Sequence, residues 1–342
     1  MKIAIITDAW SPQVNGVVRT LQSIRAELIA QGHEVLVISP DLFSSLPCPT
    51  YPEIRLAFAR SGDVGRRIAD FMPDAVHLST EGPLCLAARR WCVRRGISFT
   101  TAYHTQFPDY VSKRTGVPAE LIWHYIRWFH APARRVLVST PSVRHMLEAH
   151  GVSQTAHWSR GVDLSNFSPD APPPLEYEGL ARPIQLYVGR VAVEKNIEAF
   201  LKSDHAGTKV VVGDGPSLAA LRLAYPHVHF LGSLSGKALA GAYAGADVFV
   251  FPSRTDTFGL VMIEAMACGV PVAAYPVSGP IDVVTAETGA LNADLTAAIA
   301  NALTRDRATC AAYGASFTWT ASASQFLDAL FPLGDEMHRL AA

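Results

Sequence analysis

The stretch FPSRTDTFGLVMIEAMACGVPV, residues 251–272, holds the clearest succession of strand, loop and helix in the chain. The apolar run Val248–Val250 predicts a buried strand that leads into it, and the polar residues that follow predict a loop. Leu260–Ala267 has the apolar composition of a buried helix, and Val272–Ala274 predicts a second strand. Strand, helix and strand in this order form the unit of a parallel sheet.

The same alternation extends outward from this stretch and divides into two series. In the second series, further strands are expected at Ile184–Val188, Lys209–Val212 and His229–Leu231, with helices at Glu194–Leu201, Pro216–Ala224 and Ser235–Ala244. In the first series, strands are expected at Ile3–Ile6, Glu34–Ser39, Ala75–Ser79, Ser98–Tyr103 and Val136–Ser139, with helices at Val17–Gln31 and Leu84–Arg95. Two such series predict an α/β protein with two Rossmann-like, doubly wound domains that face each other across a cleft.

A proline-rich segment separates the two series. Pro172–Pro174 are three consecutive prolines, which neither a sheet nor a helix interior accommodates. Residues 167–183 are therefore expected to form an extended linker between domains of residues 1–166 and 184–320. Residues 321–342 are expected to form a C-terminal helix that can pack back on the first domain.

Composition excludes several classes of protein. The 342 residues are 49% hydrophobic and 17% charged, which allows a sizeable core and does not match a disordered chain. No run approaches the ~20 apolar residues that a membrane span needs, and the first eight residues predict a strand rather than a signal peptide. The five cysteines show no CxxC pairing, which argues against a zinc site or a disulfide framework. We expect a cytoplasmic protein with reduced thiols.

The two halves of the chain differ in charge. Residues 1–165 contain 18 Lys and Arg against 13 Asp and Glu, whereas the remaining residues contain 11 against 17. A basic first half indicates an anionic surface, a lipid or a phosphate as its neighbour, or else an ordinary solvated arginine-rich face. Nothing in the pattern indicates a nucleic-acid partner.

Glycine and cationic residues at strand-to-helix junctions indicate phosphate binding. Gly16 follows Asn15 directly before a predicted helix, where a glycine lets the backbone approach a phosphate, although an ordinary turn also uses glycine. Arg190 and Lys195 flank the junction after the first strand of the second series. Arginine can bind two phosphate oxygens and lysine acts as a point charge. Fixed cations here would stabilise a departing diphosphate, and two unrelated surface residues are the alternative.

Other nucleotide and metal motifs are not supported. Gly213–Leu218 superficially matches a dinucleotide-binding fingerprint, but Leu218 stands where the third glycine is required. Pro216 fits the first position of a helix, so a tight turn explains the run. The sequence shows no metal-ligand cluster and no DxD motif in this region, so we expect neither a metal nor a cofactor.

Two acids eight residues apart complete the pattern in residues 251–272. Asp256 lies in the predicted loop and Glu264 about one turn into the helix. A carboxylate can accept hydrogen bonds from two neighbouring hydroxyls of a sugar or a ribose. The N–H groups of Phe258, Gly259 and Leu260 at the helix start can donate to a phosphate or a sugar hydroxyl. An isolated acid pair would more often be solvated, but the surrounding pattern favours a binding site.

This stretch resembles the paired-acid signature of retaining glycosyltransferases of family four, in the GT-B superfamily. The resemblance spans nearly the whole chain, because Asn15-Gly16, Arg160–Asp163 and Gly213–Pro216 also match. It implies that Arg190 and Lys195 bind the diphosphate of a nucleotide sugar, Glu264 its ribose and Asp256 the transferred sugar. It further implies transfer with retention and without a metal. The family more often has Glu where this chain has Asp256.

Acceptor residues are expected in the first domain. His104 matches the family's cleft histidine near the sugar and the acceptor, and a structural histidine is the alternative. Around it, residues 103–135 combine aromatic and basic residues that suit a bilayer interface, or else the core of the domain: Lys113, Arg114, Trp123, Arg127 and Trp128. Each cation near an anionic surface contributes roughly 1 kcal/mol. The pattern resembles members that glycosylate diacylglycerol or make sulfolipid.

We therefore expect a glycosyltransferase that moves a hexose or hexuronic acid from UDP-glucose or UDP-glucuronate to a lipid such as diacylglycerol. His104, Asp256, Arg190 and Lys195 would form its catalytic centre, and the protein would lie on the cytoplasmic face of the inner membrane. A GDP-mannose-dependent α-mannosyltransferase with a glycolipid, prenyl-linked or polysaccharide acceptor is the alternative. A nucleotide-sugar epimerase and a nucleotide-sugar sensor are alternatives of other classes.

Overall fold

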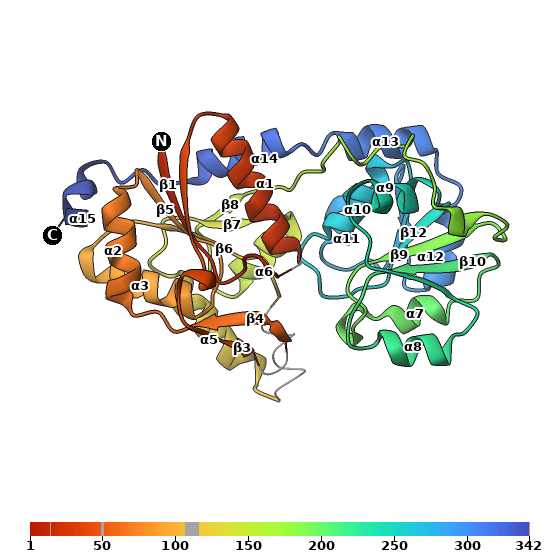
Figure 1. The fold of residues 1–342 in the computed structure, drawn as a ribbon, viewed down its shortest axis with the longest axis horizontal. Helices are drawn as coiled ribbons and strands as arrows, with labels where there is room; N and C mark the ends of the chain where they lie inside the picture. The colour runs from red at the N-terminus through yellow and green to blue at the C-terminus, as the bar shows by residue number, and fades with distance from the viewer. Residues whose placement is uncertain (14, 49–50, 107–115, 342) are drawn as a thin grey trace. The chain divides into compact units, whose positions relative to one another are not determined.

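The computed structural model describes residues 1–13, 15–48, 51–106 and 116–341 (Figure 1). The chain divides into two compact units. Unit 1 comprises Met1–Ser159 and Trp319–Ala342, and unit 2 comprises Arg160–Thr318. Each unit is built on a six-stranded sheet in which all paired strands are parallel, so the predicted α/β class with two Rossmann-like halves is confirmed.

The sheet of unit 1 is buried on both faces. In strand order it contains β2 (Glu34–Ile38), β1 (Lys2–Ile6), β5 (Ala75–Leu78), β6 (Thr100–Ala102), β7 (Val136–Val138) and β8 (Thr155–His157). The side chains of β1 alternate between two hydrophobic clusters, as expected for a strand buried on both faces. Ala4 and Ile6 pack in one cluster, whereas Ile3 and Ile5 pack in the other.

Helices from both ends of the chain cover these faces. One cluster includes side chains of α2 (Ser61–Phe71) and α3 (Pro83–Arg95), and the other includes those of α1 (Gly16–Ala30) and α14 (Trp319–Ala329). The last segment of the chain, α14 onward, thus belongs to unit 1. Among the described residues, the remaining elements of this unit are a hairpin, three helices and two short 3-10 turns: β3 (Ser45–Cys48), β4 (Tyr51–Ala57), α5 (Ala119–His130), α6 (Pro141–Ala149), α15 (His338–Ala341), η1 (Pro40–Leu42) and η4 (Gly334–Met337).

Unit 2 repeats this architecture. Its strands, in sheet order, are β11 (His229–Gly232), β10 (Thr208–Val212), β9 (Ile184–Val188), β12 (Val248–Phe251), β13 (Val272–Ala274) and β14 (Gly289–Leu291). Helices cover both faces of this sheet as well. They are α7 (Ile197–Leu201), α8 (Leu218–Ala224), α9 (Gly236–Ala244), α10 (Leu260–Ala267), α11 (Pro280–Val283), α12 (Leu295–Ala302) and α13 (Arg307–Ala315).

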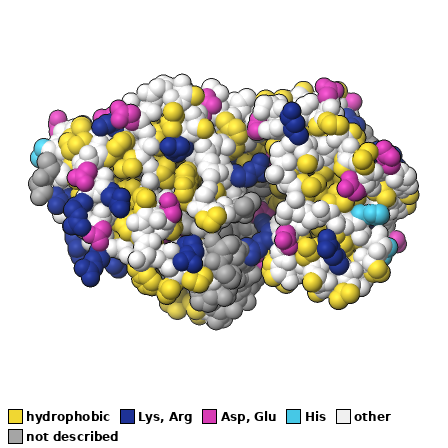
Figure 2. All heavy atoms as spheres, viewed as in Figure 1, with side chains coloured by type: hydrophobic (Ala, Val, Ile, Leu, Met, Phe, Trp, Pro, Cys, Tyr) yellow, Lys and Arg dark blue, Asp and Glu magenta, His cyan; other side chains and the backbone are white. Residues whose placement is uncertain are grey.

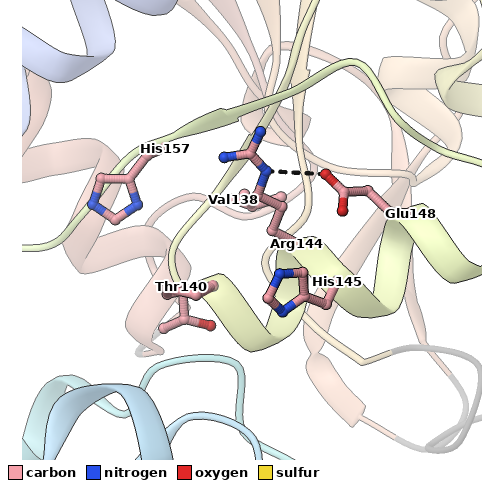
Figure 3. Close-up of a pocket in the computed structure, with 7 residues that line it drawn as sticks. Val138, Thr140, Arg144, His145, Glu148 and His157 are labelled. Carbon is pink, nitrogen blue, oxygen red and sulfur yellow. Dashed lines mark hydrogen bonds and ion pairs between the residues drawn. The ribbon is translucent and has the colours of Figure 1, made fainter.

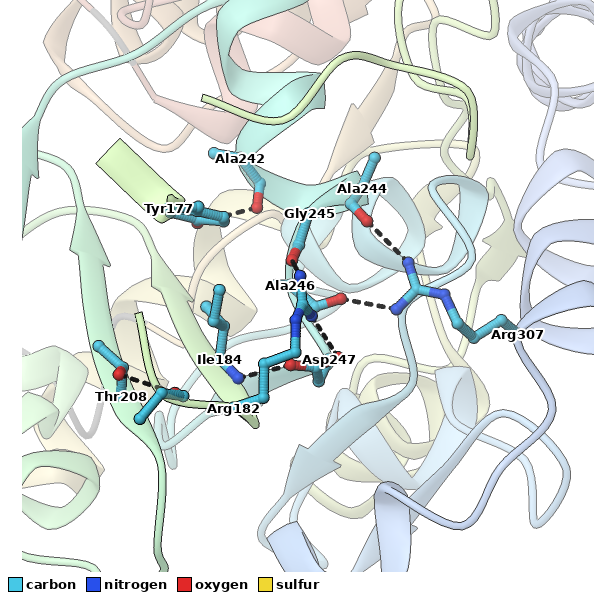
Figure 4. A network of polar contacts seen from close by, with 11 residues as sticks. Tyr177, Arg182, Ile184, Thr208, Ala242, Ala244, Gly245, Ala246, Asp247 and Arg307 are labelled. Carbon is cyan, nitrogen blue, oxygen red and sulfur yellow. Dashed lines mark hydrogen bonds and ion pairs between the residues drawn. The ribbon is translucent and has the colours of Figure 1, made fainter. Parts of the chain in front are cut away.

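The predicted linker, residues 167–183, lies within unit 2 in the structure instead of between two domains. Phe167 and Tyr177 are buried in the hydrophobic core of unit 2, and the Tyr177 hydroxyl donates to the carbonyl of Ala242 at 3.0 Å. Arg182 pairs with Asp247 at 2.6 Å in the same network (Figure 4). The chain passes between the units after Ser159, not after residue 166. Prolines bar regular structure but not the burial of the aromatic residues between them.

Candidate functional site

The predicted donor residues lie at the point where the strand order of unit 2 reverses. From β9 the chain continues to β10 and β11 on one side and then returns to β12 on the other side. The loops after β9 and β12 therefore lead to opposite faces of the sheet, and doubly wound sheets bind their ligands at this place. Arg190 and Lys195 follow β9, and Asp256 follows β12.

An ion pair joins these two loops. The Lys195 ammonium donates to Asp256 Oδ1 at 2.6 Å, and the two side chains are 28% and 23% exposed. Burial raises the pKa of Asp256, but the charge and hydrogen bond of Lys195, with help from the Ser253 hydroxyl, outweigh it and hold the pKa below its ordinary value. Asp256 is therefore an anion at neutral pH. The pair remains accessible, so both groups can exchange partners when a ligand arrives.

Asn196 fixes the position of Lys195, and the sequence analysis assigned it no role. Lys195 ends a short 3-10 turn, η3 (Val193–Lys195), and Asn196 follows in the left-handed conformation with φ of 54°. Its side-chain amide donates to the carbonyl of Pro252 at 3.1 Å. Because Pro252 follows β12, this bond ties the two loops together. An asparagine at the end of a lysine-bearing turn is the signal that could have identified it, since asparagine tolerates this conformation.

Glycines allow the neighbouring loops to touch through their backbones. A Cβ on Gly213 would lie 1.9 Å from the carbonyl oxygen of Gly189, and one on Gly215 would lie 2.4 Å from that of Val191. Gly213 also has φ of 140°, which disfavours any side chain. The run Gly213–Leu218 thus brings the loop after β10 against the loop after β9, which agrees with rejecting a dinucleotide fingerprint.

At the start of α10 the Phe258 side chain is buried, and the backbone turns into the helix at Gly259. Phe258 is 5% exposed and packs edge-on against Phe317 at 6.1 Å, so its side chain belongs to the core. Gly259 has φ of 83° and turns the chain into the helix that Leu260 begins. The buried Phe258 side chain leaves the backbone N–H groups as the predicted ligand contacts at this position.

Glu264 lies deeper than the ion pair. It is 2% exposed, and its Oε2 accepts a hydrogen bond from the Tyr243 hydroxyl at 3.2 Å. Tyr243 is itself buried on α9. The structure therefore brings Lys195 and Asp256 into direct contact and holds Glu264 against a neighbouring helix.

The predicted acceptor residue His104 and the predicted phosphate-binding residue Gly16 both lie in unit 1. His104 follows β6, and its ring packs edge-on against Trp158 at 5.5 Å. Gly16 is the exposed first residue of α1, which Asn15 caps by accepting from the N–H of Val18 at 3.0 Å. Lys113 and Arg114 lie outside the described residues.

The two tryptophans of α5 have different environments: of the two alternatives, core and bilayer interface, Trp123 fits the core and Trp128 is exposed. Trp123 is 5% exposed and stacks on His150 at 3.7 Å, so it belongs to the core. Trp128 is 46% exposed and lies under the Arg89 guanidinium at 3.8 Å. Arg127 of the same helix is half-buried. The helical period sends residues five apart to different faces.

Unit 1 has its own reversal of strand order, between β1 and β5, and an acid that the sequence analysis missed lies there. Asp8 accepts from the N–H of Leu84 at 2.8 Å and from the Thr80 hydroxyl at 2.9 Å. Burial nevertheless raises its pKa above the ordinary value, and these hydrogen bonds oppose the rise only in part. A Cβ on Gly82 would lie 2.3 Å from Asp8 Cγ, so this glycine admits the carboxylate to the start of α3.

A second buried acid lies in the loop between β5 and α3. Glu81 Oε1 lies 3.4 Å from His130 Nε2, and both side chains are buried. Burial raises the pKa of Glu81, against the lowering effect of His130. An acid placed directly before Gly82-Pro83, a helix-start signal, could have marked this position.

Two further surveys cover the described part of the chain. There, no group of three or more His, Cys, Asp or Glu side chains is arranged to hold a metal ion. None of the helices in that part combines the length and the apolar composition that a bilayer span requires.

Sequence comparison supports the resemblance. Residues 14–166 match the family described as Glycosyltransferase Family 4, and residues 182–305 match the one described as Glycosyl transferases group 1. A GDP-mannose-dependent alpha-mannosyltransferase of Mycolicibacterium smegmatis is 34% identical over 308 residues, which cover 83% of this chain and 82% of that protein. A sulfoquinovosyl transferase of Arabidopsis thaliana is 33% identical over 300 residues, which cover 79% of this chain and 58% of that protein.

Solved structures agree on the fold. A sucrose-phosphate synthase from Thermosynechococcus elongatus matches with a TM-score of 0.73 at 24% identity, over 96% of this chain and 97% of that chain. At this identity the match supports the GT-B architecture alone. The family matches, the sequence relatives and the strand order lead to one conclusion: the chain is a glycosyltransferase and belongs to glycosyltransferase family 4.

Proposed function

We propose that the protein transfers a hexose from a nucleotide diphosphate sugar to a lipid acceptor, with retention of configuration and without a metal. The observation that carries the proposal is the Lys195–Asp256 ion pair, which lies where the strand order of unit 2 reverses. A cation there meets the developing charge of a leaving diphosphate, and an accessible carboxylate beside it meets sugar hydroxyls.

Each residue of the donor site then has a distinct part. Arg190 and Lys195 bind the diphosphate, and Lys195 exchanges Asp256 for a phosphate oxygen when the donor enters. Asp256, which that lysine keeps ionised, then accepts hydrogen bonds from hydroxyls of the transferred sugar. Glu264 accepts hydrogen bonds from the ribose hydroxyls. The hydrogen bond that the Tyr243 hydroxyl donates to Glu264 keeps the carboxylate in place. The first N–H groups of α10 face the same ligand.

The relatives favour GDP-mannose as the donor. The mannosyltransferase of Mycolicibacterium smegmatis and one of Mycobacterium tuberculosis, at 34% and 32% identity, are both named GDP-mannose-dependent. UDP-glucose and UDP-glucuronate, the donors favoured by the sequence pattern, remain the second candidate. An alpha-monoglucosyldiacylglycerol synthase of Streptococcus pneumoniae, 26% identical, supports that candidate by its name.

A lipid acceptor is supported by the surface of unit 1. Lys and Arg side chains gather over α2 and α3, as Figure 2 shows, and these helices carry the exposed residues Arg66, Arg67, Arg90 and Arg94. Trp128 of α5 adds an exposed aromatic ring beside Arg89 of α3. Arginines with an exposed tryptophan suit the interface of an anionic bilayer. Peripheral attachment at the cytoplasmic face would bring the enzyme to its acceptor.

The test incubates purified protein with radiolabelled GDP-mannose, UDP-glucose and UDP-glucuronate in the presence of lipid vesicles, and then measures label in the lipid phase. We expect labelled lipid from one donor. Lys195→Ala should lose this label. Lys202→Ala serves as its control, because Lys202 also pairs with a carboxylate, Glu198, at 2.8 Å but is largely exposed and follows α7. Label that never leaves the aqueous phase, with any donor, would refute the lipid acceptor.

A further inference from the structure

A pocket of about 410 Å³ opens at the carboxyl edge of the unit 1 sheet, and the family resemblance assigns it no role. Its polar lining comes from the start of α6, from the body of that helix and from β8: Thr140, Arg144, His145, Glu148 and His157 (Figure 3). The volume falls within the range of sites for small molecules, roughly 300–1,000 Å³. A polar pocket of this size can accept a compact headgroup.

Arg144 supplies an oriented pair of donors. Its Nε donates to Glu148 Oε1 at 3.0 Å, while the terminal nitrogens of the guanidinium point to the His157 side of the pocket (Figure 3). The two side chains are 54% and 36% exposed, so the ion pair itself contributes little to stability. Its effect is to hold the guanidinium with two N–H groups presented together, which is the geometry that binds a phosphate.

The other lining groups favour the same kind of ligand. His145 and His157 lie on either side of Arg144 and add ring nitrogens that donate hydrogen bonds. Thr140 caps α6 by accepting from the N–H of Val143, and the pocket adjoins the positive end of this helix. The acid of the pocket, Glu148, is already engaged by Arg144. The other polar side chains of the lining, Thr140, His145 and His157, can each donate a hydrogen bond.

The pocket lies on the same sheet edge as the proposed acceptor histidine. It adjoins β7, which pairs with β6, and His104 follows β6. On its other side is β8, whose last residue, His157, precedes the Trp158 that packs against the His104 ring. A ligand that reached from His104 into the pocket would remain within unit 1.

We propose that this pocket binds a phosphate group of the acceptor, so that the acceptor is a phosphate-bearing hydroxyl compound rather than uncharged diacylglycerol. This inference rests on the proposed function, because it assumes that the protein has an acceptor and that unit 1 binds it. The shared chemistry is a phosphate ester next to free hydroxyls, and either a phospholipid headgroup or a soluble phosphate ester can supply it. A fixed guanidinium makes the charged ligand bind where a neutral polyol does not.

A binding experiment tests the pocket without requiring activity. The imidazole and guanidinium NMR signals of the full-length protein are followed during titration with glycerol 3-phosphate and, separately, with glycerol. We expect saturable shifts of His145, His157 and Arg144 with the phosphate ester and none with glycerol. Arg144→Ala should weaken this binding roughly tenfold or more. The matched control is Lys202→Ala, since Lys202 also forms an exposed ion pair with an acid four residues away, Glu198.

Three outcomes would overturn the inference: no shifts with glycerol 3-phosphate, equal shifts with glycerol, or equal losses in the two variants. Transfer assays then separate the sources, using vesicles that contain phosphatidylinositol, vesicles that contain diacylglycerol, and soluble glycerol 3-phosphate. Selective loss of transfer to a phosphate-bearing acceptor in Arg144→Ala supports the inference. Full transfer to diacylglycerol in that variant, without phosphate binding, refutes it. Phosphate binding without any transfer would instead refute the proposed function and leave the pocket assignment standing.

Discussion

Both units place an acid beside the reversal of strand order, after β1 in unit 1 and after β12 in unit 2, but surround it differently. In unit 2, Asp256 meets a lysine and its pKa falls; in unit 1, Asp8 meets backbone N–H groups and a hydroxyl, and its pKa rises because burial prevails. Asp256 keeps 23% of its side chain exposed, whereas Asp8 is 8% exposed as a residue and caps a helix. At the reversal in unit 2 an accessible ion pair is present, whereas at the reversal in unit 1 the acid is occupied by hydrogen bonds to the start of α3.

The comparison shows that topology locates a site but does not supply its chemistry. Both positions satisfy the rule for ligand binding in doubly wound sheets. A diphosphate needs a cation, and in unit 2 the loop after β9 supplies Lys195, which pairs with Asp256. In unit 1 the groups with donor character lie further along the edge, around Arg144.

The largest expected effect is on catalysis through Lys195. We expect Lys195→Ala to lower kcat roughly hundredfold to thousandfold, because it removes the group that stabilises charge on the leaving diphosphate. Asp8→Asn, the acid variant at the opposite reversal, should leave kcat within a few fold. Steady-state kinetics with a fixed acceptor measure both. A similar loss of kcat in the two variants, with folded protein in each, would contradict a catalytic role for the unit 2 pair alone.

An intermediate effect is expected on stability at two glycines. Gly213→Ala should destabilise unit 2 by roughly 2–4 kcal/mol, because its Cβ would collide with a backbone oxygen and its φ of 140° disfavours a side chain. Gly82→Ala should cost less, about 1–2 kcal/mol, since the Asp8 side chain it meets can move at the expense of its cap. Urea unfolding measures both free energies. The reverse order would show that the backbone contact in unit 2 is easily relaxed.

The smallest effect, and the sharpest test of the comparison, is the pH dependence of stability. Asp256 has a lowered pKa, so its stabilising contribution is complete above the ordinary value of 3.8 and is lost as pH falls through the folded-state value. Asp8 has a raised pKa, so the folded state binds its proton more tightly and the acid lowers stability as pH rises through and above 3.8.

Melting temperatures of Asp256→Asn and Asp8→Asn, measured from acid to neutral pH, test these signs. The difference between wild type and Asp256→Asn should grow in favour of wild type as pH rises. The difference between wild type and Asp8→Asn should shrink over the same range. If the difference in melting temperature from wild type changed with pH in the same direction for both variants, the two acids would not have pKa values shifted in opposite directions.

Much of the fold could be predicted because parallel strands and their helices carry local signals. The strands of unit 2 from β9 to β13 agree with the predicted ranges within one or two residues. The hairpin β3–β4 and the edge strands β8 and β14 were not predicted. Thr155–His157 and Gly289–Leu291 are three residues each, too short to show a period, and they become strands by pairing with a neighbour.

The donor residues were accessible to sequence reasoning because each follows a recognisable strand or begins a helix. The acids of unit 1 were not, since Asp8 acquires its role from the N–H of Leu84, 76 residues away. Burial was also invisible: Trp123 and Trp128 look alike in the sequence, yet one lies in the core and the other on the surface.

The sequence by itself determined the two series of strands and helices, the loops that carry Arg190, Lys195, Asp256 and Glu264, and the family to which they belong. These features depend on periodicity and on turn residues, which act over a few positions. Only the tertiary structure decided that Lys195 meets Asp256 across 61 residues, that Asp8 closes its own reversal, and that Arg144 faces a pocket. Those outcomes depend on which strands pair and how far each side chain is buried, and no local pattern encodes either.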